Sequence, residues 1–269
     1  MNGSTEPPDA EAAAVRRPPL VRELLLVAGL FLVYKFGRQL ATGHTGEARS
    51  NGHRVWDLER ALHLPGEGSV QSLLLHGDGL AQIANTYYAA VHFPATAGFL
   101  VWLYLRRPAH YVWARRVLAT VTSAALVLPF AYPLAPPRML TGTGLVDTAH
   151  VYGPSVYGPP SSDHLSNQFA AMPSLHFAWA LMVALGLIAA TRSRWRLLWL
   201  LHPLVTLLVI VGTANHYWVD ALVATAMLGV ALAVIRRPRR TVGTAGSGGG
   251  LRAPAAGKRD EKVLVGAGR

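Results

Sequence analysis

The sequence contains no cysteine, so disulfides, thiolate nucleophiles and cysteine metal ligands are all excluded. Charge is also scarce: only 14% of the 269 residues are charged, whereas soluble globular chains carry about 25%. Hydrophobic residues make up 51% of the chain and fall in long blocks that lack Asp, Glu, Lys and Arg. This composition favours a helical membrane protein over a soluble one.

Acidic residues are fewer than basic ones, and the formal net charge is +11. In a soluble protein such an excess would indicate a nucleic-acid partner. Here the arginines lie in short clusters beside the apolar blocks, as expected for cytoplasmic loops near anionic lipid headgroups. We therefore expect no nucleic-acid partner.

The two ends of the chain differ in composition from its middle. Residues 1–19 carry Pro, Ala and charged residues without apolar periodicity, and residues 236–269 run from an arginine cluster into a Gly-rich stretch. Both segments are typical of disordered tails. They flank a predicted membrane catalytic domain over residues 20–235.

The apolar blocks predict an all-α fold, a polytopic membrane bundle of about six transmembrane helices, because a bilayer crossing needs about 20 apolar residues. The candidate spans are about 20–38, within 79–105, within 117–137, about 173–191, about 197–212 and about 215–235. A signal peptide is the other interpretation of the first block, although no small-residue cleavage site follows it closely. Residues 212–214 allow only a tight turn, so the last two spans are predicted to form an antiparallel hairpin.

The basic loops predict the orientation of the bundle, because lysine and arginine are retained on the cytoplasmic side of short loops. The clusters are Arg16 and Arg17, Arg106 to Arg116, Arg192 to Arg196, and Arg236 to Arg240. All four fall on one side of the six-span topology. We expect a multi-pass protein, in the plasma membrane, with both termini cytoplasmic and the loop over residues 137–172 facing outward.

Three polar segments lie at the predicted outer ends of spans. In the first, a proline-rich stretch over residues 132–137 is followed by Arg138, whose guanidinium fork could hold a phosphate by two hydrogen bonds. An ordinary interfacial arginine is the other interpretation.

The second segment covers residues 171–176 and contains Pro173, Ser174 and His176 just before a long apolar run. Proline suits the first helical position, so the free amides of the first turn predict an anion site with Ser174 and His176 beside it. A helix start that happens to contain a histidine is the alternative.

The third segment contains His216 and Asp220, which are four residues apart. This spacing predicts that they share a helix face, where Asp220 can accept the proton on one ring nitrogen of His216 and leave the other as a nucleophile. An aspartate in an apolar span is costly unless it has a task. A polar pair that packs helices together is the competing interpretation.

Together the segments supply a cation, an anion site, one histidine with a carboxylate partner and one without. These are the parts required for phosphoryl transfer through a covalent histidine intermediate, without a metal or a cofactor. Their order and spacing resemble the type 2 phosphatidic acid phosphatase superfamily over about residues 80–235. The APPR, PSLH and HxxxD segments look most similar to its inositolphosphotransferase branch, related to inositol phosphorylceramide synthases.

The resemblance implies a role for each residue. His216 attacks phosphorus and Asp220 orients it, His176 protonates the leaving oxygen, and Arg138 with the Ser174 region binds the phosphoryl oxygens. It also implies six spans with the active site facing away from the cytoplasm.

The sequence departs from the superfamily pattern at three positions. Ala131 stands where the pattern has a lysine, Val209-Ile210 where it has Ser-Arg, and Leu175 where it has a glycine. Two phosphate-binding cations are therefore absent, and each lost contact could remove several kcal/mol of transition-state stabilisation.

These features predict an integral membrane phosphatase or phosphotransferase. It would move a phosphoryl or phospho-head group from a membrane lipid phosphate to water or to an alcohol such as inositol. A polyprenyl-phosphate phosphatase of envelope synthesis is an alternative within the enzymes. A non-catalytic transporter or scaffold that binds anionic lipid is the alternative from another class, and the two missing cations favour it.

Overall fold

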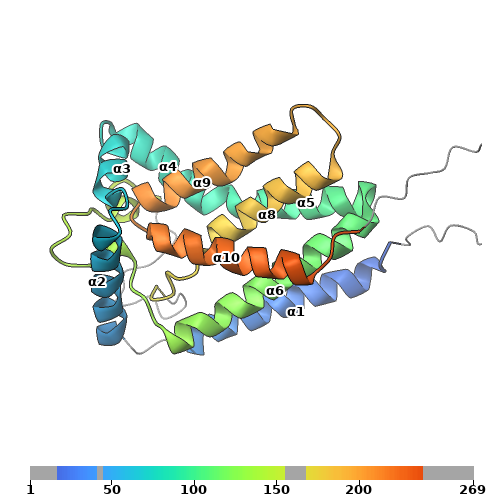
Figure 1. Ribbon diagram of the computed structural model, residues 1–269, viewed down its shortest axis with the longest axis horizontal. Coiled ribbons are helices and arrows are strands. Elements are labelled where there is room, and N and C mark those ends of the chain that lie inside the picture. The colour runs from blue at the N-terminus through green and yellow to red at the C-terminus, as the bar shows by residue number, and fades with distance from the viewer. Residues whose placement is uncertain (1–16, 41–44, 155–167, 239–269) are drawn as a thin grey trace, which may run out of the picture. The chain divides into compact units, whose positions relative to one another are not determined.

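The computed structural model describes residues 17–40, 45–154 and 168–238, and this part of the chain is helical (Figure 1). The helices are α1 (Leu20–Leu40), α2 (Thr45–Ala61), α3 (Glu67–Leu74), α4 (Asp78–Ala90), α5 (His92–Arg106), α6 (Pro108–Ala131), η1 (Pro137–Met139), α7 (Thr148–Tyr152), α8 (Leu175–Ala190), η2 (Arg196–Leu200), α9 (Leu201–Gly212) and α10 (Trp218–Val234). An isolated bridge joins Leu134 and Ala170, and the described residues form no strand. The all-α prediction is confirmed. The predicted tails lie outside the described residues, apart from residues 17–19 and 236–238.

The second predicted span is two helices rather than one. Helices α4 and α5 meet at Val91 with a bend of 43°. Pro94 explains the break, because a proline ring clashes with the carbonyl four residues earlier and cannot donate to it. That carbonyl belongs to Ala90, where α4 ends.

Helix α6 begins nine residues before the third apolar block that the sequence suggested. Pro108 occupies its first turn, a position for which the fixed φ of proline is suited. Arg115 and Arg116 interrupt the apolar run without interrupting the helix. The boundary of an apolar block was therefore a poor guide to the boundary of the helix.

Helix α6 is the one described helix that is long and apolar enough to cross a membrane by length and composition. The bent pair α4–α5 makes a second such segment if it is counted as one span. The described helices α8 and α10, and the segment 196–212 that contains α9, are apolar but shorter. The count of six spans stays a prediction.

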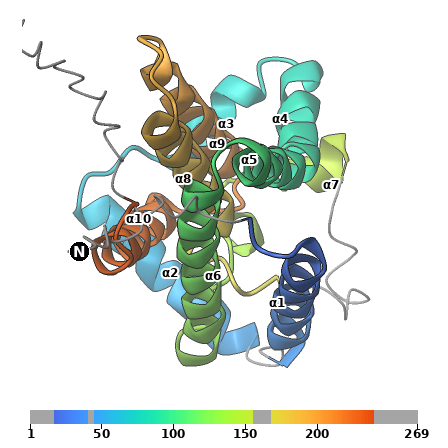
Figure 2. The ribbon, with the colours of Figure 1, turned by 90° about the vertical axis from the view of Figure 1, so that its right-hand side faces the viewer.

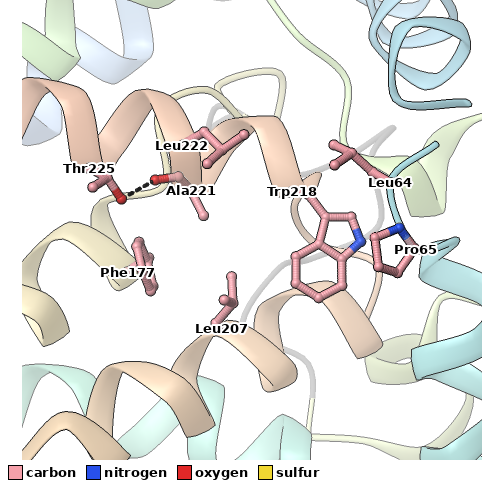
Figure 3. A pocket seen from close by; sticks show the side chains of 8 residues that line it. All are labelled: Leu64, Pro65, Phe177, Leu207, Trp218, Ala221, Leu222 and Thr225. Carbon is pink, nitrogen blue, oxygen red and sulfur yellow. Dashed lines mark hydrogen bonds between the residues drawn. The ribbon is translucent and has the colours of Figure 1, made fainter. Parts of the chain in front are cut away.

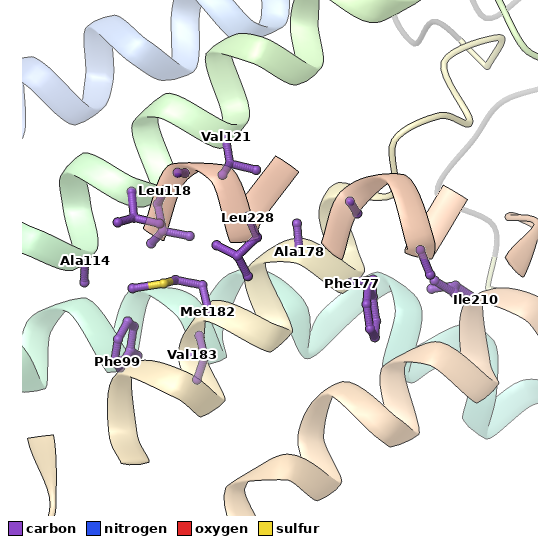
Figure 4. Close-up of a cluster of buried hydrophobic side chains, with 14 of the residues drawn as sticks. Phe99, Ala114, Leu118, Val121, Phe177, Ala178, Met182, Val183, Ile210 and Leu228 are labelled. Carbon is purple, nitrogen blue, oxygen red and sulfur yellow. The ribbon is translucent and has the colours of Figure 1, made fainter. Parts of the chain in front are cut away.

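Helix α8 lies at the centre of the bundle, where it packs against α5, α6, α9 and α10 (Figure 2). The core between them is built from apolar side chains such as Phe99, Leu118, Met182 and Leu228 (Figure 4). Gly186 permits the closest approach, because a Cβ there would lie 2.3 Å from Cζ of Phe99. Helix α1 lies at the edge of this group, beside α6.

Many large apolar side chains on the outer faces of the helices are exposed. Leu25, Val127 and Val234 have exposed fractions of 69%, 64% and 74%. Others of the same kind are Val33, Val101, Phe130, Leu204, Leu208, Leu222 and Val230. Apolar surface of this extent is typical of a face that contacts lipid or another protein.

The two ends of the bundle differ in chemistry. The arginines between α5 and α6, between α8 and η2, and after α10 lie at one end (Figure 1). Hydrogen bonds join the elements there; for example, Arg17 donates to the Leu105 carbonyl at 2.8 Å, and the Trp113 indole donates to the Ile235 carbonyl at 3.0 Å. The start of α8 and the start of α10 lie at the opposite end, with α2 and α3.

The predicted hairpin of the last two spans is only partly correct. A tight turn does follow α9, since the amides of Asn215 and His216 both donate to the Ile210 carbonyl at 3.1 Å. Ala214 within this turn has a φ of +53°. The two helices then separate, and each packs against α8 rather than closely against its partner.

Candidate active site

Main-chain hydrogen bonds bring the three predicted segments together at the end of the bundle opposite the arginines. The amide of Leu134 donates to the Phe169 carbonyl at 2.8 Å, and the amide of Ala171 donates back to the Leu134 carbonyl at 3.2 Å. The amide of Arg138 donates to the Ala214 carbonyl at 3.0 Å. Stretches that are far apart in the sequence therefore form one framework.

Helix α2 supports this framework, a role the sequence did not predict. Asn51 donates from Nδ2 to the Pro133 carbonyl at 2.9 Å, and the Ala48 carbonyl accepts from the Ala135 amide at 3.0 Å. The hydroxyl of Tyr217, fully buried, donates to the Ala135 carbonyl at 2.9 Å. A second core made of small and apolar side chains fills the space: Ala48, Val55, Leu134, Ala135, Leu140, Ala171, Met172 and Tyr217.

His216 and Asp220 are paired, but not across one face of a helix as predicted. Helix α10 begins only at Trp218, with Tyr217 as its N-cap, so His216 precedes the helix. Asp220 is at the third helical position, and its Oδ2 accepts from the Tyr217 amide at 3.0 Å and lies 3.1 Å from Nδ1 of His216. The carboxylate therefore caps the helix and orients the imidazole with the same oxygen.

The surroundings of His216 determine which of its nitrogens carries the proton. Nδ1 lies 2.8 Å from the Ala171 carbonyl and 3.1 Å from Asp220 Oδ2, and both of these atoms are acceptors. Nδ1 must therefore be protonated, and in the neutral ring the lone pair is on Nε2. A ring nitrogen of this kind can act as a nucleophile.

Ser174 is the N-cap of α8, so the helix starts two residues later than the prediction based on Pro173. Its Oγ accepts from the Phe177 amide at 3.4 Å, and its own amide donates to the Asp220 carbonyl at 3.4 Å. Pro173 is excluded from the first turn because the chain becomes helical only at Leu175. Ser174 thus joins α8 to α10, and its contact with phosphate stays a prediction.

His176 lies in the first turn of α8 within a group of aromatic rings. Its ring stacks on Tyr88 with centroids 4.3 Å apart, and it lies 4.5 Å from His92 and 6.2 Å from His216. His92 also stacks on Trp179 at 5.1 Å. The structure therefore places His92 directly beside His176.

Arg138 is held by three side chains in the described part of the chain. Nε donates to Oδ1 of Asn215 at 3.0 Å, NH1 to Oδ2 of Asp147 at 3.0 Å, and NH2 to Oε1 of Gln168 at 3.2 Å. Its side chain is only 4% exposed. Asn215 directly precedes His216, so the guanidinium is fixed beside the His216–Asp220 pair.

Sequence reasoning missed Asp147 and Gln168 as members of the site. Asp147 had a detectable signal, because an acidic residue shares a predicted outer loop with the single arginine of that loop. Asp147 also caps α7 through the His150 amide at 3.1 Å. Gln168 had no such signal, since a lone glutamine in a loop has no characteristic spacing.

The structure offers no replacement cation at the two substituted positions. Ala131 ends α6 and is exposed, and the side chains of Val209 and Ile210 are buried in the main core. Elsewhere in the described segments, no group of three or more histidine or acidic side chains is arranged to hold a metal ion. Among the described residues, Arg138 is the cation that lies beside Asn215 and the His216–Asp220 pair.

An apolar cavity of about 160 Å³ lies between α8, α9 and α10 (Figure 3). Its lining residues are Leu64, Pro65, Phe177, Leu207, Trp218, Ala221, Leu222 and Thr225. Phe177 follows His176 in the sequence, and Ala221 follows Asp220. The cavity thus adjoins the start of α8, which carries His176, and the start of α10, which His216 precedes. Apolar side chains line it there.

The model of the PAP2 superfamily matches residues 53–234, a stretch that contains all three segments. The chain belongs to the PAP2 superfamily. Members of this superfamily are generally phosphatases, so this PAP2 protein is an enzyme that acts on phosphate-containing substrates. No curated protein and no solved structure gives a significant match to it.

Proposed function

We propose that this PAP2 protein is an integral membrane enzyme that transfers a phosphoryl or phospho-head group from a membrane lipid phosphate to water or an alcohol, through a phosphohistidine at His216. The observation that carries the proposal is the position of Nδ1 of His216 between two acceptors. With Nδ1 protonated, Nε2 holds the lone pair that covalent catalysis requires.

In the first step of the proposed reaction, Nε2 of His216 attacks phosphorus. The bond between phosphorus and the leaving alkoxide breaks, and His176, protonated at that stage, gives its proton to the leaving oxygen. Asp220 is a positioning residue, since it holds the Nδ1 proton and stabilises the positive charge that develops on the ring. The products are an alcohol and a phosphohistidine.

In the second step, neutral His176 takes a proton from water or from an alcohol. The resulting oxygen nucleophile attacks phosphorus, the bond from Nε2 to phosphorus breaks, and the imidazole returns to its starting state. Water as acceptor gives inorganic phosphate, and an alcohol gives a new phosphate ester. The acceptor is the point at which a phosphatase and an inositolphosphotransferase differ.

Arg138 is the proposed ligand of the phosphoryl oxygens. Asp147, Gln168 and Asn215 fix its fork, which favours bidentate binding because little side-chain entropy is lost when phosphate arrives. Hydrogen bonds to charged groups are worth about 1.5–3 kcal/mol each. A well-oriented arginine can therefore offset part of the loss of the two other cations.

A lipid substrate is supported by two features. The outer faces of the helices expose apolar side chains, and the cavity beside α8 and α10 is lined by apolar groups. Its volume of about 160 Å³ resembles apolar cavities of roughly 150 Å³ that accept a benzene-sized molecule. A few carbons of an alkyl chain next to the phosphate fit such a space.

The proposed topology has six spans within residues 20–235, with α4–α5 as one bent span. The basic loops would be cytoplasmic, and the site would open on the other side of the plasma membrane. The arginine-rich loops lie at one end of the helices, and the helix starts beside His176 and His216 lie at the other. This separation supports the proposed orientation.

Phosphate release by the full-length protein in detergent tests the proposal. Several lipid phosphates, including a phosphatidic acid and a polyprenyl phosphate, would be compared with and without inositol, beside His216→Ala and Asp220→Asn. We expect activity in the native protein and strong loss in both variants. Equal release by all three proteins would refute the mechanism. Binding of anionic lipid by a native protein that neither hydrolyses nor transfers would favour the non-catalytic alternative.

A further inference from the structure

Two glutamates that belong to none of the three segments lie buried near the start of α10, next to the His216–Asp220 pair. Glu59 of α2 and Glu67 of α3 are both fully buried. Oε2 of Glu67 accepts from NH2 of Arg60 at 2.5 Å, while NH1 of Arg60 is 4.0 Å from Oε2 of Glu59. Arg60 in turn lies over the Trp56 ring at 3.7 Å. One arginine therefore faces two carboxyl groups.

Glu59 reaches the start of α10 and binds it directly. Its Oε1 accepts from the Val219 amide at 2.8 Å. Val219 is the second residue of α10 and precedes Asp220, whose own carboxylate accepts from the Tyr217 amide. Two first-turn donors are thus satisfied by two carboxyl groups, one from within the helix and one from α2.

The remaining oxygens of the two glutamates indicate a shared proton. Within the described residues, Oε2 of Glu59 and Oε1 of Glu67 are buried and have no hydrogen-bond partner, and both carboxyl groups face the same guanidinium, that of Arg60. Two ionised carboxylates buried beside one arginine repel each other, and this favours a proton on one of them. Burial, and then the neighbouring Glu67 carboxyl group, raise the pKa of Glu59 from 4.5 to about 9.

We propose that Glu59 is a positioning residue of the active site, which holds the first turn of α10, and with it the Asp220–His216 pair, as long as it shares a proton with Glu67. The inference rests on the proposed function for its catalytic readout. Loss of the shared proton places two negative charges side by side. The pair then separates, and the amide of Val219 loses its fixed partner.

Several other ionisable groups lie around Glu59. Arg60 faces it from α2, Glu67 from α3, and Asp220 and Tyr217 from α10. The η1 turn also packs on α2 and carries Arg138, whose guanidinium is directed to Asp147, Gln168 and Asn215. Among these groups, Glu67 is the carboxyl that shares Arg60 with Glu59.

Infrared spectroscopy of the full-length protein tests the shared proton without reference to activity. A protonated carboxylic acid has a C=O stretching band that an ionised carboxylate lacks. We expect native protein at pH 7 to show such a band that disappears as the pH passes about 9. Glu59→Gln and Glu67→Gln should each lack it, and Asp57→Asn, an exposed carboxyl of α2, should retain it. The same band in all four proteins, or in none, would overturn the proposal.

The pH profile of phosphate release tests the positioning role. Glutamine at position 59 can accept from Val219 and donate to Glu67, so Glu59→Gln should stay within about threefold of native kcat near neutral pH. In the native protein kcat should fall at high pH, as Glu59 ionises. In Glu59→Gln this fall should be absent. Glu59→Leu removes the acceptor and should lower kcat at least tenfold while KM changes little.

Identical alkaline limbs in native protein and Glu59→Gln would contradict the positioning role even if Glu59→Leu failed to fold. The outcome for the proposed function is separate from these results. An inactive native protein with the expected infrared band would refute the proposed function and keep the shared proton. An active native protein whose infrared band is unaffected by Glu59→Gln would keep the proposed function and refute the shared proton.

Discussion

The imidazole rings of His176 and His216 lie with their centroids 6.2 Å apart and their planes inclined by 56°. They lie at the starts of different helices, and the two rings are tilted rather than stacked. Tyr88 and His92 also contact the His176 ring, at 4.3 Å and 4.5 Å between centroids. Two imidazoles at this separation can act on the same phosphate from different directions, one on phosphorus and one on an oxygen.

Removal of the proposed proton donor should depend on the leaving group. His176→Ala is expected to slow cleavage of an alkyl phosphate by about 10²–10⁴-fold, the usual contribution of general acid–base catalysis. An aryl phosphate with an acidic phenol needs little protonation, so its first step should be slowed much less. Burst kinetics with both substrates would measure that step directly. Equal losses would assign His176 a structural role.

Arg138 is expected to require its planar fork as well as its charge. Arg138→Lys keeps the charge but cannot satisfy Asp147, Gln168 and Asn215 together, so kcat/KM should fall by about tenfold to a few hundredfold, equivalent to one or two charge-assisted hydrogen bonds. Arg49→Lys is the matched control, because Arg49 is exposed on α2. Comparable effects of the two substitutions on kcat/KM would show that charge alone suffices.

A methyl group at position 52 should disturb the framework behind the site. A Cβ on Gly52 would lie 2.8 Å from Cδ2 of Leu140, 3.0 Å from the Tyr217 hydroxyl and 3.2 Å from the Ala135 carbonyl. Gly52→Ala should therefore lower thermal stability and activity together, since overpacking typically costs about 1–3 kcal/mol. The control is Gly46→Ala in the same helix, where nothing lies within 4 Å.

Thermal unfolding in detergent would compare the two alanine variants. Gly46→Ala should leave the melting temperature unchanged or raise it, because alanine favours the helix by about 1 kcal/mol over glycine. A loss of stability of the same size in both variants would mean that the close approach at Gly52 carries no special role.

The sequence predicted the helical class and named segments that the structure brings together, but not how they are joined. Spacing alone paired His216 with Asp220, yet the pairing arises because the carboxylate caps α10 and reaches back past its start. Periodicity counts residues along a helix, and it cannot show where the helix begins. Pro94 was a usable signal for the break between α4 and α5, because the effect of proline on a preceding turn is local.

Contacts between distant segments were outside the reach of that reasoning. In the sequence Glu59 lies between the first two predicted spans, and the packing of α2 brings it to the Val219 amide. Gln168 and Asn215 likewise gain their positions from the hydrogen bonds that join separate loops. Side chains that support a site through tertiary contacts have no fixed spacing from the residues that they support.

Trapping of the covalent intermediate tests the central claim most directly. Full-length protein would be mixed briefly with a lipid phosphate labelled at phosphorus, quenched with alkali to preserve phosphohistidine, and digested for peptide mapping. We predict label on the peptide that contains His216, stable to alkali and lost in acid, and no label in His216→Ala. Phosphate release by the native protein with no labelled peptide, or equal labelling of the His216→Ala protein, would contradict the account.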